Sequence, residues 1–287
     1  MFRSLTTMAA LALCLIVTGW AVRPASAQME PYDPNSIEVD VELLLLVDVS
    51  RSMSSNELEI QRRGYAESLI SPEVLKAING GMIGHVAIAY VEWAGAYSQR
   101  VVQDWAIIRS EQDAQAFARA IAMNPGQGMR RTSISAALTS GAGYFYKNGF
   151  TGLRRVIDVS GDGPNNDGRP VALARDAVVA QGITINGLPL MTRDGLGGRW
   201  SIENLDAYYR DCVVGGPGAF VVPVLEWSEF AAAVRKKLVL EIAGTTPQPP
   251  SLFSFSEPSD RVIPAQASAD CLIGEKIWEQ YRRDWEP

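Results

Sequence analysis

The chain has 287 residues, of which 32 are acidic and 26 basic, so its net charge at pH 7 is −6. This negative charge argues against nucleic acid or an anionic membrane surface as the main partner. The only histidine, His85, gives little support to a histidine-based zinc site or to a Ser-His-Asp triad.

Residues 1–27 have the features of a secretory signal peptide. Arg3 is the charged start, residues 8–22 are apolar, and residues 25–27 form an A-x-A cleavage pattern. Cleavage before Gln28 leaves 260 residues with a net charge of −8, because two arginines and no acids are removed. That length suits one α/β domain with a tail, and no later apolar segment is long enough to span a membrane. The mature chain is therefore expected in the periplasm or outside the cell.

An apolar run at residues 43–47, L-L-L-L-V, is followed by side chains that carry oxygen. The run does not alternate between polar and apolar residues, which is typical of a strand buried on both faces of a parallel sheet, although a buried helix shares this pattern. Asp48, Ser50 and Ser52 follow at alternate positions. A capping box, S-S-N-E at residues 54–57, then predicts a helix over residues 55–70. This order of elements predicts a ligand crevice at the carboxyl end of the strand.

The residue types in this loop indicate a metal ligand. One carboxylate and two hydroxyls are hard oxygen ligands, which suit Mg²⁺, with Mn²⁺ and Ca²⁺ as alternatives. The competing interpretation is that Asp48, Ser50 and Ser52 are only turn and cap residues.

The middle of the chain predicts a hairpin and a second polar loop. A short helix over residues 72–79 precedes strands at 86–93 and 101–108, whose connection is too short for a helix, so the pair should be antiparallel. A helix from Ser110 to about residue 123 leads into a glycine-containing loop and then a helix over residues 133–147. Thr132 therefore lies at a helix N-terminus, where its hydroxyl either caps the helix or faces a ligand.

A third polar loop follows the predicted strand at residues 155–160. Asp162 lies there between two glycines, in the position that corresponds to the serines after the first strand. Asp158 falls inside the strand and is interpreted as a hydrogen-bonded structural acid. The remaining predicted elements are helices at 171–181, 202–212 and 228–242 and strands at 183–190 and 219–225.

The C-terminal part contains two cysteines and three aromatic residues of interest. Cys212 and Cys271 remain after signal cleavage, and in an oxidising compartment a disulfide between them is the simplest pairing, with two buried thiols as the alternative. Residues 245–287 are predicted to be a linker and a tail packed back on the domain. Trp278, Tyr281 and Trp285 are interpreted as packing anchors of this tail, with a binding patch as the alternative.

Taken together, these motifs resemble a von Willebrand factor type A domain with a metal-ion-dependent adhesion site, over residues 38 to about 244. The resemblance is carried by D-x-S-x-S at Asp48, Ser50 and Ser52, by Thr132 in the second loop and by Asp162 after the fourth strand. The stretches V-D-V-S-R-S-M, I-D-V-S-G-D-G and G-G-P-G-A-F also resemble a bacterial secreted subfamily with no assigned function. One departure is the loop G-Q-G-M-R-R-T, where Arg130 and Arg131 replace small residues.

This resemblance implies an α/β fold with a doubly wound, Rossmann-like sheet. The sheet would have six strands, mostly parallel with one antiparallel edge strand, and helices on both faces, within a domain over residues 28–244. It also implies that the serines and the threonine bind Mg²⁺ directly or through water, that the two aspartates assist, and that an acidic side chain of a partner completes the coordination.

Three functions follow from these observations. The first is a secreted or periplasmic binding module that captures a protein or other ligand with a carboxylate through bound Mg²⁺, and that has no enzymatic activity. The second is a Mg²⁺-dependent phosphoester hydrolase with Asp48 as nucleophile, which lacks the second acid two residues later because Ser50 stands there. The third is a metal site that only holds three loops together.

Overall fold

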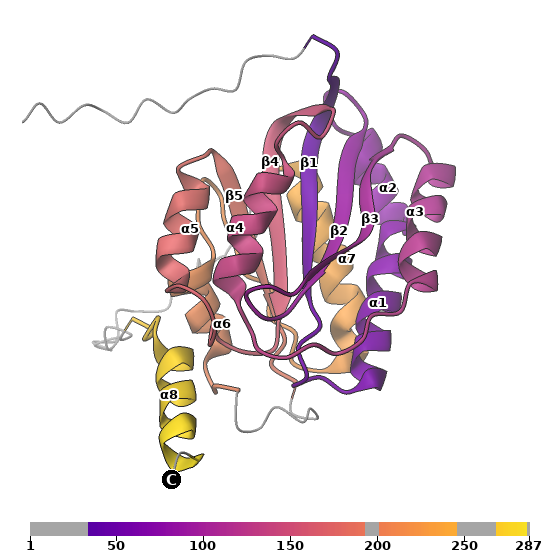
Figure 1. Cartoon of the computed structure of the whole chain (residues 1–287). Coiled ribbons are helices and arrows are strands. Elements are labelled where there is room, and N and C mark those ends of the chain that lie inside the picture. The colour runs from indigo at the N-terminus through magenta and orange to yellow at the C-terminus, as the bar shows by residue number, and fades with distance from the viewer. Residues whose placement is uncertain (1–33, 193–200, 246–267, 286–287) are drawn as a thin grey trace, which may run out of the picture. The chain divides into compact units, whose positions relative to one another are not determined.

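The computed structural model describes residues 34–192, 201–245 and 268–285, and these form an α/β fold around one sheet (Figure 1). The predicted signal peptide and most of the linker lie outside the described residues. In the sheet, the strand order is β3-β2-β1-β4-β5, and every neighbouring pair is parallel except β2 and β3. The strand bounds are β1 Ile37–Asp48, β2 Val86–Trp93, β3 Gln99–Ile108, β4 Phe150–Gly161 and β5 Ile183–Pro189.

The central strand β1 is buried on both faces, which explains its run of leucines. Leu43 and Leu45 pack into one hydrophobic core, and Leu44 and Leu46 pack into a second core on the opposite face. Each of these side chains is at most 1% exposed. A strand between two cores needs apolar residues at successive positions, so the continuous run is a strand and not a helix.

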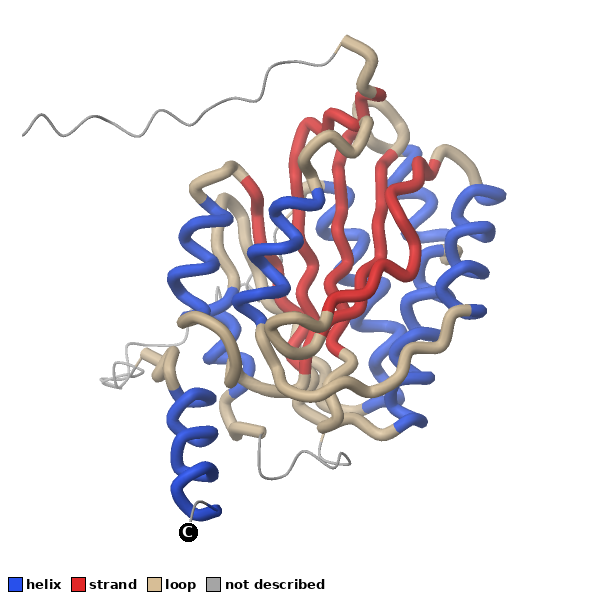
Figure 2. Tube along the Cα trace, in the orientation of Figure 1, coloured by secondary structure: helices blue, strands red, loops and turns tan. Residues whose placement is uncertain are grey.

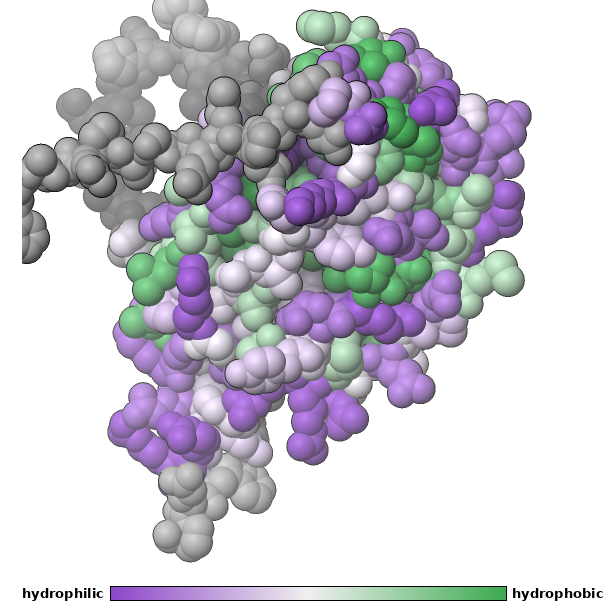
Figure 3. Space-filling model, turned by 45° about the horizontal axis from the view of Figure 1, so that its top comes forward, coloured by the Kyte–Doolittle hydropathy of each residue, from purple (hydrophilic) through white to green (hydrophobic). Residues whose placement is uncertain are grey.

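Helices cover both faces of the sheet (Figure 2). One core contains side chains of α1, α2, α3 and α7, and the other contains side chains of α4, α5 and α6. The bounds are α1 Ser55–Leu69, α2 Pro72–Asn79, α3 Glu111–Met123, α4 Ile134–Tyr144, α5 Val171–Val179, α6 Leu205–Tyr208 and α7 Phe230–Ala243. The capping box that predicts α1 is present, because Ser54 accepts a hydrogen bond from the Glu57 amide and Glu57 accepts one from the Ser54 amide. The face shown in Figure 3 is mainly hydrophilic, with separate hydrophobic patches.

The prediction of a sixth strand at residues 219–225 is wrong in its extent. This segment makes only two isolated parallel bridges with the edge of the sheet, Gly187 with Val221 and Leu190 with Val224. Both bridges have the same register, and the pairing between them would need an amide N–H at position 189. Pro189 has none, so the ladder is interrupted there and the described sheet has five strands.

The predicted helix at residues 202–212 is also shorter and less regular than expected. It consists of α6 followed by a π-helical turn, η1 Tyr209–Val213, in which the Val214 amide bonds to the Tyr209 carbonyl. Tyr208, Tyr209, Cys212 and Val213 are all fully buried. These four residues are spaced i, i+1, i+4 and i+5, so they lie on one face of the helical segment, and this face packs into the core.

The described part of the tail is a helix, α8 Ile273–Trp285, which contacts the rest of the fold at its start. Cys271 forms a disulfide with Cys212, with Cα atoms 5.4 Å apart. Nearby, the Asn165 Nδ2 group donates a hydrogen bond of 2.7 Å to Glu275. None of the helices within the described residues has the length and apolarity needed to cross a membrane.

Candidate metal and ligand site

The candidate site lies at the carboxyl ends of the neighbouring strands β1 and β4. From β1 the chain crosses to β2 on one side, and from β4 it crosses to β5 on the other. The order of the strands thus reverses between β1 and β4, and the loops after these strands diverge. This divergence opens a crevice in which the predicted residues meet.

The loop after β1 presents Asp48, Ser50 and Ser52. Asp48 is fully buried at the end of the strand, and its Oδ1 accepts a 2.7 Å hydrogen bond from the Ser50 amide. The hydroxyls of Ser50 and Ser52 lie 2.8 Å apart. Gln61 of α1 donates to the Asp48 carbonyl, which fixes the loop against the helix that follows it.

Asp162, after β4, joins this loop. Its Oδ1 accepts a 2.8 Å hydrogen bond from the Ser52 hydroxyl and a longer one, 3.5 Å, from the Ser50 hydroxyl. Residues separated by 110 positions in the sequence are thus in direct contact at the two central strands.

The loop that contains Thr132 lies against the same serines. The Met129 amide donates to the Val49 carbonyl, and the Arg51 amide donates to the Met129 carbonyl, so the two loops pair through their backbones. Ser133, and not Thr132, caps α4, because the Ser133 hydroxyl accepts a bond from Ala136. The Thr132 side chain is therefore not needed as a cap, and it lines the same cavity as Ser50 and Ser52.

Two asparagines that the sequence did not single out hold the threonine loop in place. The Thr132 amide donates to Asn166 Oδ1 at 3.0 Å, and the Asn166 amide donates to the Thr132 carbonyl. Asn165 Oδ1 accepts a bond from the Ser135 amide in the first turn of α4. The only sequence signal was the polar run N-N-D after Asp162, which does not reveal its partners.

The surroundings of the two aspartates disfavour two ionised carboxylates side by side. Burial raises the pKa of Asp48 well above its ordinary value, and the nearby charge of Asp162 raises it further. Burial likewise raises the pKa of Asp162 to about 6. Asp48 Oδ2 is buried without a hydrogen-bond partner among the described residues. A Cβ at Gly161 would lie 2.9 Å from this oxygen, so the glycine leaves the carboxylate its space.

The five predicted residues supply the donor types that a hard divalent cation prefers. They offer two carboxylates and three hydroxyls. One of the carboxylate oxygens, Asp48 Oδ2, has no hydrogen-bond partner in the described structure. A cation here would satisfy that oxygen and reduce the repulsion between the two acids. Within the described ranges no group of three or more His, Cys, Asp or Glu side chains could hold a metal, so hydroxyls are essential to this candidate site.

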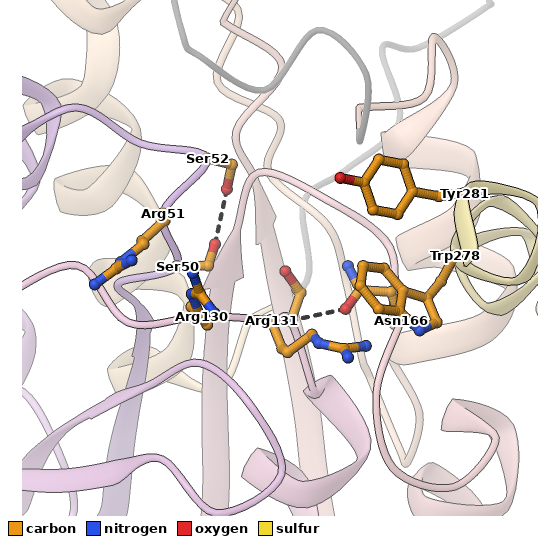
Figure 4. A pocket seen from close by; sticks show the side chains of 9 residues that line it. Ser50, Arg51, Ser52, Arg130, Arg131, Asn166, Trp278 and Tyr281 are labelled. Carbon is orange, nitrogen blue, oxygen red and sulfur yellow. Dashed lines mark hydrogen bonds between the residues drawn. The ribbon is translucent and has the colours of Figure 1, made fainter. Parts of the chain in front are cut away.

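A cavity of about 490 Å³ opens beside the serines and the threonine (Figure 4). Its walls also include Arg51, Arg130, Arg131, Asn166, Trp278 and Tyr281. The two aromatic residues come from α8, and the Arg131 guanidinium lies over the Trp278 ring, 3.4 Å from its centroid. Trp278 and Tyr281 thus form a wall of the cavity, a position that their interpretation as packing anchors did not include. The side chain of Trp285 lies outside the described residues.

Other sequence candidates lie away from this cavity. Asp158 is buried in β4, where it forms an ion pair of 2.7 Å with the buried Lys237, a contact that suits a structural acid. The His85 Nε2 atom is 3.0 Å from the Glu38 carbonyl oxygen, at the opposite end of the strands.

Comparison with solved structures defines the class of fold. The chain is similar to proximal thread matrix protein 1 from the mussel byssus (15% identity, TM-score 0.52, 72% of this chain and 49% of that chain). It is also similar to a von Willebrand factor type A protein from Catenulispora acidiphila (14%, TM-score 0.51, 71% and 43%) and to the pilus adhesin SpaC from Lactobacillus rhamnosus GG (14%, TM-score 0.52, 72% and 31%). The fold is thus that of a von Willebrand factor type A domain. The chain spans about half of the length of the mussel protein and less of the other two.

The sequence itself identifies the family. Residues 38–246 match the family described as Protein of unknown function (DUF1194), and the chain belongs to it. A comparison with curated proteins found no match. Helix α8, which supplies the aromatic wall of the cavity, lies beyond the residues that match the family.

Proposed function

We propose that this protein is a secreted or periplasmic binding module that captures an acidic ligand or protein partner through bound Mg²⁺. The observation that carries the proposal is the meeting of hydroxyls and carboxylates from separate loops, with the Ser52 hydroxyl 2.8 Å from Asp162 Oδ1. Asp48, Ser50, Ser52, Thr132 and Asp162 would hold the ion. When bound, Mg²⁺ would offer an open coordination position to an oxygen of the ligand, with Mn²⁺ and Ca²⁺ as alternatives.

Two further points support a binding role. The cavity beside the proposed ion is open to a ligand and is lined by basic and aromatic side chains, which suit an acidic partner. Similar structures include a pilus adhesin and a byssus matrix protein, although the likeness shows the fold alone. The predicted signal peptide and the disulfide suit a location outside the cytoplasm.

The hydrolase alternative has less support in the geometry. Asp48 is fully buried and does not line the cavity, so its carboxylate is poorly placed to attack a phosphorus atom. The expected result is no Mg²⁺-dependent phosphatase activity. Activity that is lost in Asp48→Asn would instead favour this alternative.

The proposal predicts that the double variant Ser50→Ala with Ser52→Ala binds Mg²⁺ at least about tenfold more weakly than the unaltered protein. The measurement is isothermal titration calorimetry on the whole purified protein. The matched control is Ser55→Ala, because Ser55 is an exposed serine at the start of α1, outside the cluster. Unchanged Mg²⁺ affinity in the double variant would refute the metal site.

A purely structural metal is separated from a binding function by a second measurement. Mg²⁺ should raise the melting temperature under both interpretations, because it binds the folded state. Only the binding function predicts that capture of a partner from the native envelope fraction requires Mg²⁺, is lost with a chelator and is lost in the double serine variant. If the chelator does not reduce the capture of the partner, the metal has a structural role only.

A further inference from the structure

The cavity beside the proposed ion has a basic rim in a protein that is acidic overall. Arg51, Arg130 and Arg131 contribute to its walls, and no acidic residue does. All three arginines are exposed, and within the described residues none forms an ion pair with a carboxylate. Three cations that have no carboxylate partner in the described part of the chain, beside a metal that two aspartates would neutralise, leave an excess of positive charge for the ligand to balance.

The position of Arg131 is set by its backbone and by α8. Arg131 has φ = 73°, in the left-handed region that residues other than glycine rarely adopt. Its guanidinium stacks on Trp278, 3.4 Å from the ring centroid, and Figure 4 shows Tyr281 beside this pair. A cation on the face of an indole is stabilised and still keeps its N–H donors at the edge of its plane.

The aromatic wall is itself anchored. The Cys212–Cys271 disulfide attaches the chain just before α8, and the Asn165–Glu275 hydrogen bond attaches the first turn of the helix. Asn165 also accepts the bond from the Ser135 amide in α4, so the helix is tied to the segment that follows Thr132. The wall and the threonine loop are therefore held together before any ligand arrives, which lowers the entropic cost of binding.

On this basis, and resting on the proposed function, we infer that the cavity recognises a peptide segment with two acidic groups. The first carboxylate would complete the coordination of the ion held by Ser50 and Ser52. The second would accept hydrogen bonds from Arg130 and Arg131, and the chain between them would pass along Trp278 and Tyr281. Guanidinium groups suit this role because they bind carboxylates with two parallel N–H donors. The acidic charge of the whole protein disfavours a long polyanion such as nucleic acid.

The test uses two blocked tripeptides that start with aspartate and differ only in the third residue, glutamate or glutamine. Dissociation constants are measured by calorimetry on the whole protein in Mg²⁺. The glutamate peptide should bind about tenfold more tightly, the size expected for one charge-assisted interaction. In Arg130→Gln with Arg131→Gln this preference should fall to about twofold or less, while Mg²⁺ dependence of both peptides remains.

The controls separate specific recognition from net charge. Arg109→Gln with Arg119→Gln removes the same charge from exposed arginines outside the cavity and should keep the tenfold preference. Trp278→Ala should reduce the preference because it removes the support of Arg131, and Trp278→Phe should retain most of it because a ring face remains.

The possible outcomes separate a failure of this inference from a failure of the proposed function. An unchanged preference in the double arginine variant, with Mg²⁺ dependence intact, overturns this inference and leaves the proposed function standing. If both peptides bind equally well with a chelator present or to the double serine variant, the result counts against both proposals. The absence of binding by either peptide also counts against both proposals. A competition experiment with inorganic phosphate gives a further outcome. If phosphate binds the cavity with a lower dissociation constant than the glutamate peptide and displaces it, the cavity is a phosphate site and the inference is overturned.

Discussion

At the scale of single residues, two energetically unfavourable features lie at the candidate site. Asp48 is buried with one carboxylate oxygen that has no partner among the described residues, and Arg131 has a left-handed backbone. A buried unpaired oxygen and a left-handed residue each cost about 1–3 kcal/mol. Asp48 lies at the end of β1 beside Gly161 of β4, and Arg131 lies in the loop before α4 and lines the cavity, so both features occur around the candidate site.

Because Arg131 has a positive φ angle, we predict that glycine at this position gives a more stable protein than alanine does. Arg131→Ala loses the stacking on Trp278 and keeps the strained φ, so it should lower the free energy of unfolding by about 1 kcal/mol. Arg131→Gly also loses the stacking but relieves the strain, so it should be more stable than the alanine variant by about 0.5–1 kcal/mol. Urea denaturation of both variants measures the difference. An alanine variant equal to or more stable than the glycine variant would contradict the role assigned to this φ angle.

At the scale of elements, short interruptions of regular structure decide how the chain passes the edge of the sheet. The Val222 amide donates to the Gly187 carbonyl and the Val224 amide donates to the Pro189 carbonyl, and the two isolated bridges keep one register. The segment therefore occupies the position of a sixth strand, but its hydrogen-bond ladder lacks the bond that an N–H at residue 189 would donate. The π-helical turn at Tyr209–Val213 is a second interruption of regular structure, and it contains Cys212, which forms the disulfide with Cys271.

A substitution at Pro189 tests whether the missing backbone N–H group is the cause of the interrupted ladder. In Pro189→Ala the new amide should donate to the Val222 carbonyl and join the two bridges into one ladder. The new amide of residue 189 should then exchange with solvent as slowly as that of Gly187, which already donates to the Phe220 carbonyl. Hydrogen exchange followed by NMR makes the comparison. Fast exchange at residue 189 would show that another constraint separates the bridges.

At the scale of the whole molecule, a buried ionic cluster connects α7 with two strands. Lys237 is fully buried and pairs with Asp158 of β4 and with Glu241 one turn further along α7. Glu241 also accepts a 2.9 Å hydrogen bond from Asn186 of β5. One cation faces two acids, and burial raises the pKa of both, that of Glu241 to about 7. The stability of the whole fold should therefore depend on pH.

The sign of this dependence follows from the raised pKa of Glu241. Its ordinary value is 4.5, so between pH 4.5 and 7 the unfolded chain loses this proton more readily than the folded protein does. The contribution of Glu241 to stability is complete below pH 4.5 and is lost as the pH rises through 7, by at most about 3 kcal/mol. In Glu241→Gln this loss should be absent, so stability should change less between pH 5 and pH 8. Urea denaturation across this range tests it, and parallel curves for the variant and the unaltered protein would refute it.

The amino-acid sequence by itself determined the class of fold and the elements at its centre. The unbroken apolar run at residues 43–47 indicates a strand with a core on each face, and the capping box at residues 54–57 marks the start of α1. Such features are local, because the burial pattern of a strand and the cap of a helix depend on neighbours in the sequence. The five candidate ligand residues lie in loops that follow predicted strands or precede a predicted helix, but they were brought together by the resemblance to a von Willebrand factor type A domain, and their role in metal binding stays a prediction.

Only the tertiary structure decided what surrounds those residues. The Asn166 side chain meets the Thr132 amide, and Trp278 meets Arg131 across 147 positions, through contacts that no local pattern encodes. The missing ladder bond at Pro189 likewise depends on which segment lies beside β5. Long-range contacts depend on how the loops at one end of the sheet converge, and this convergence is set by the packing of the whole domain.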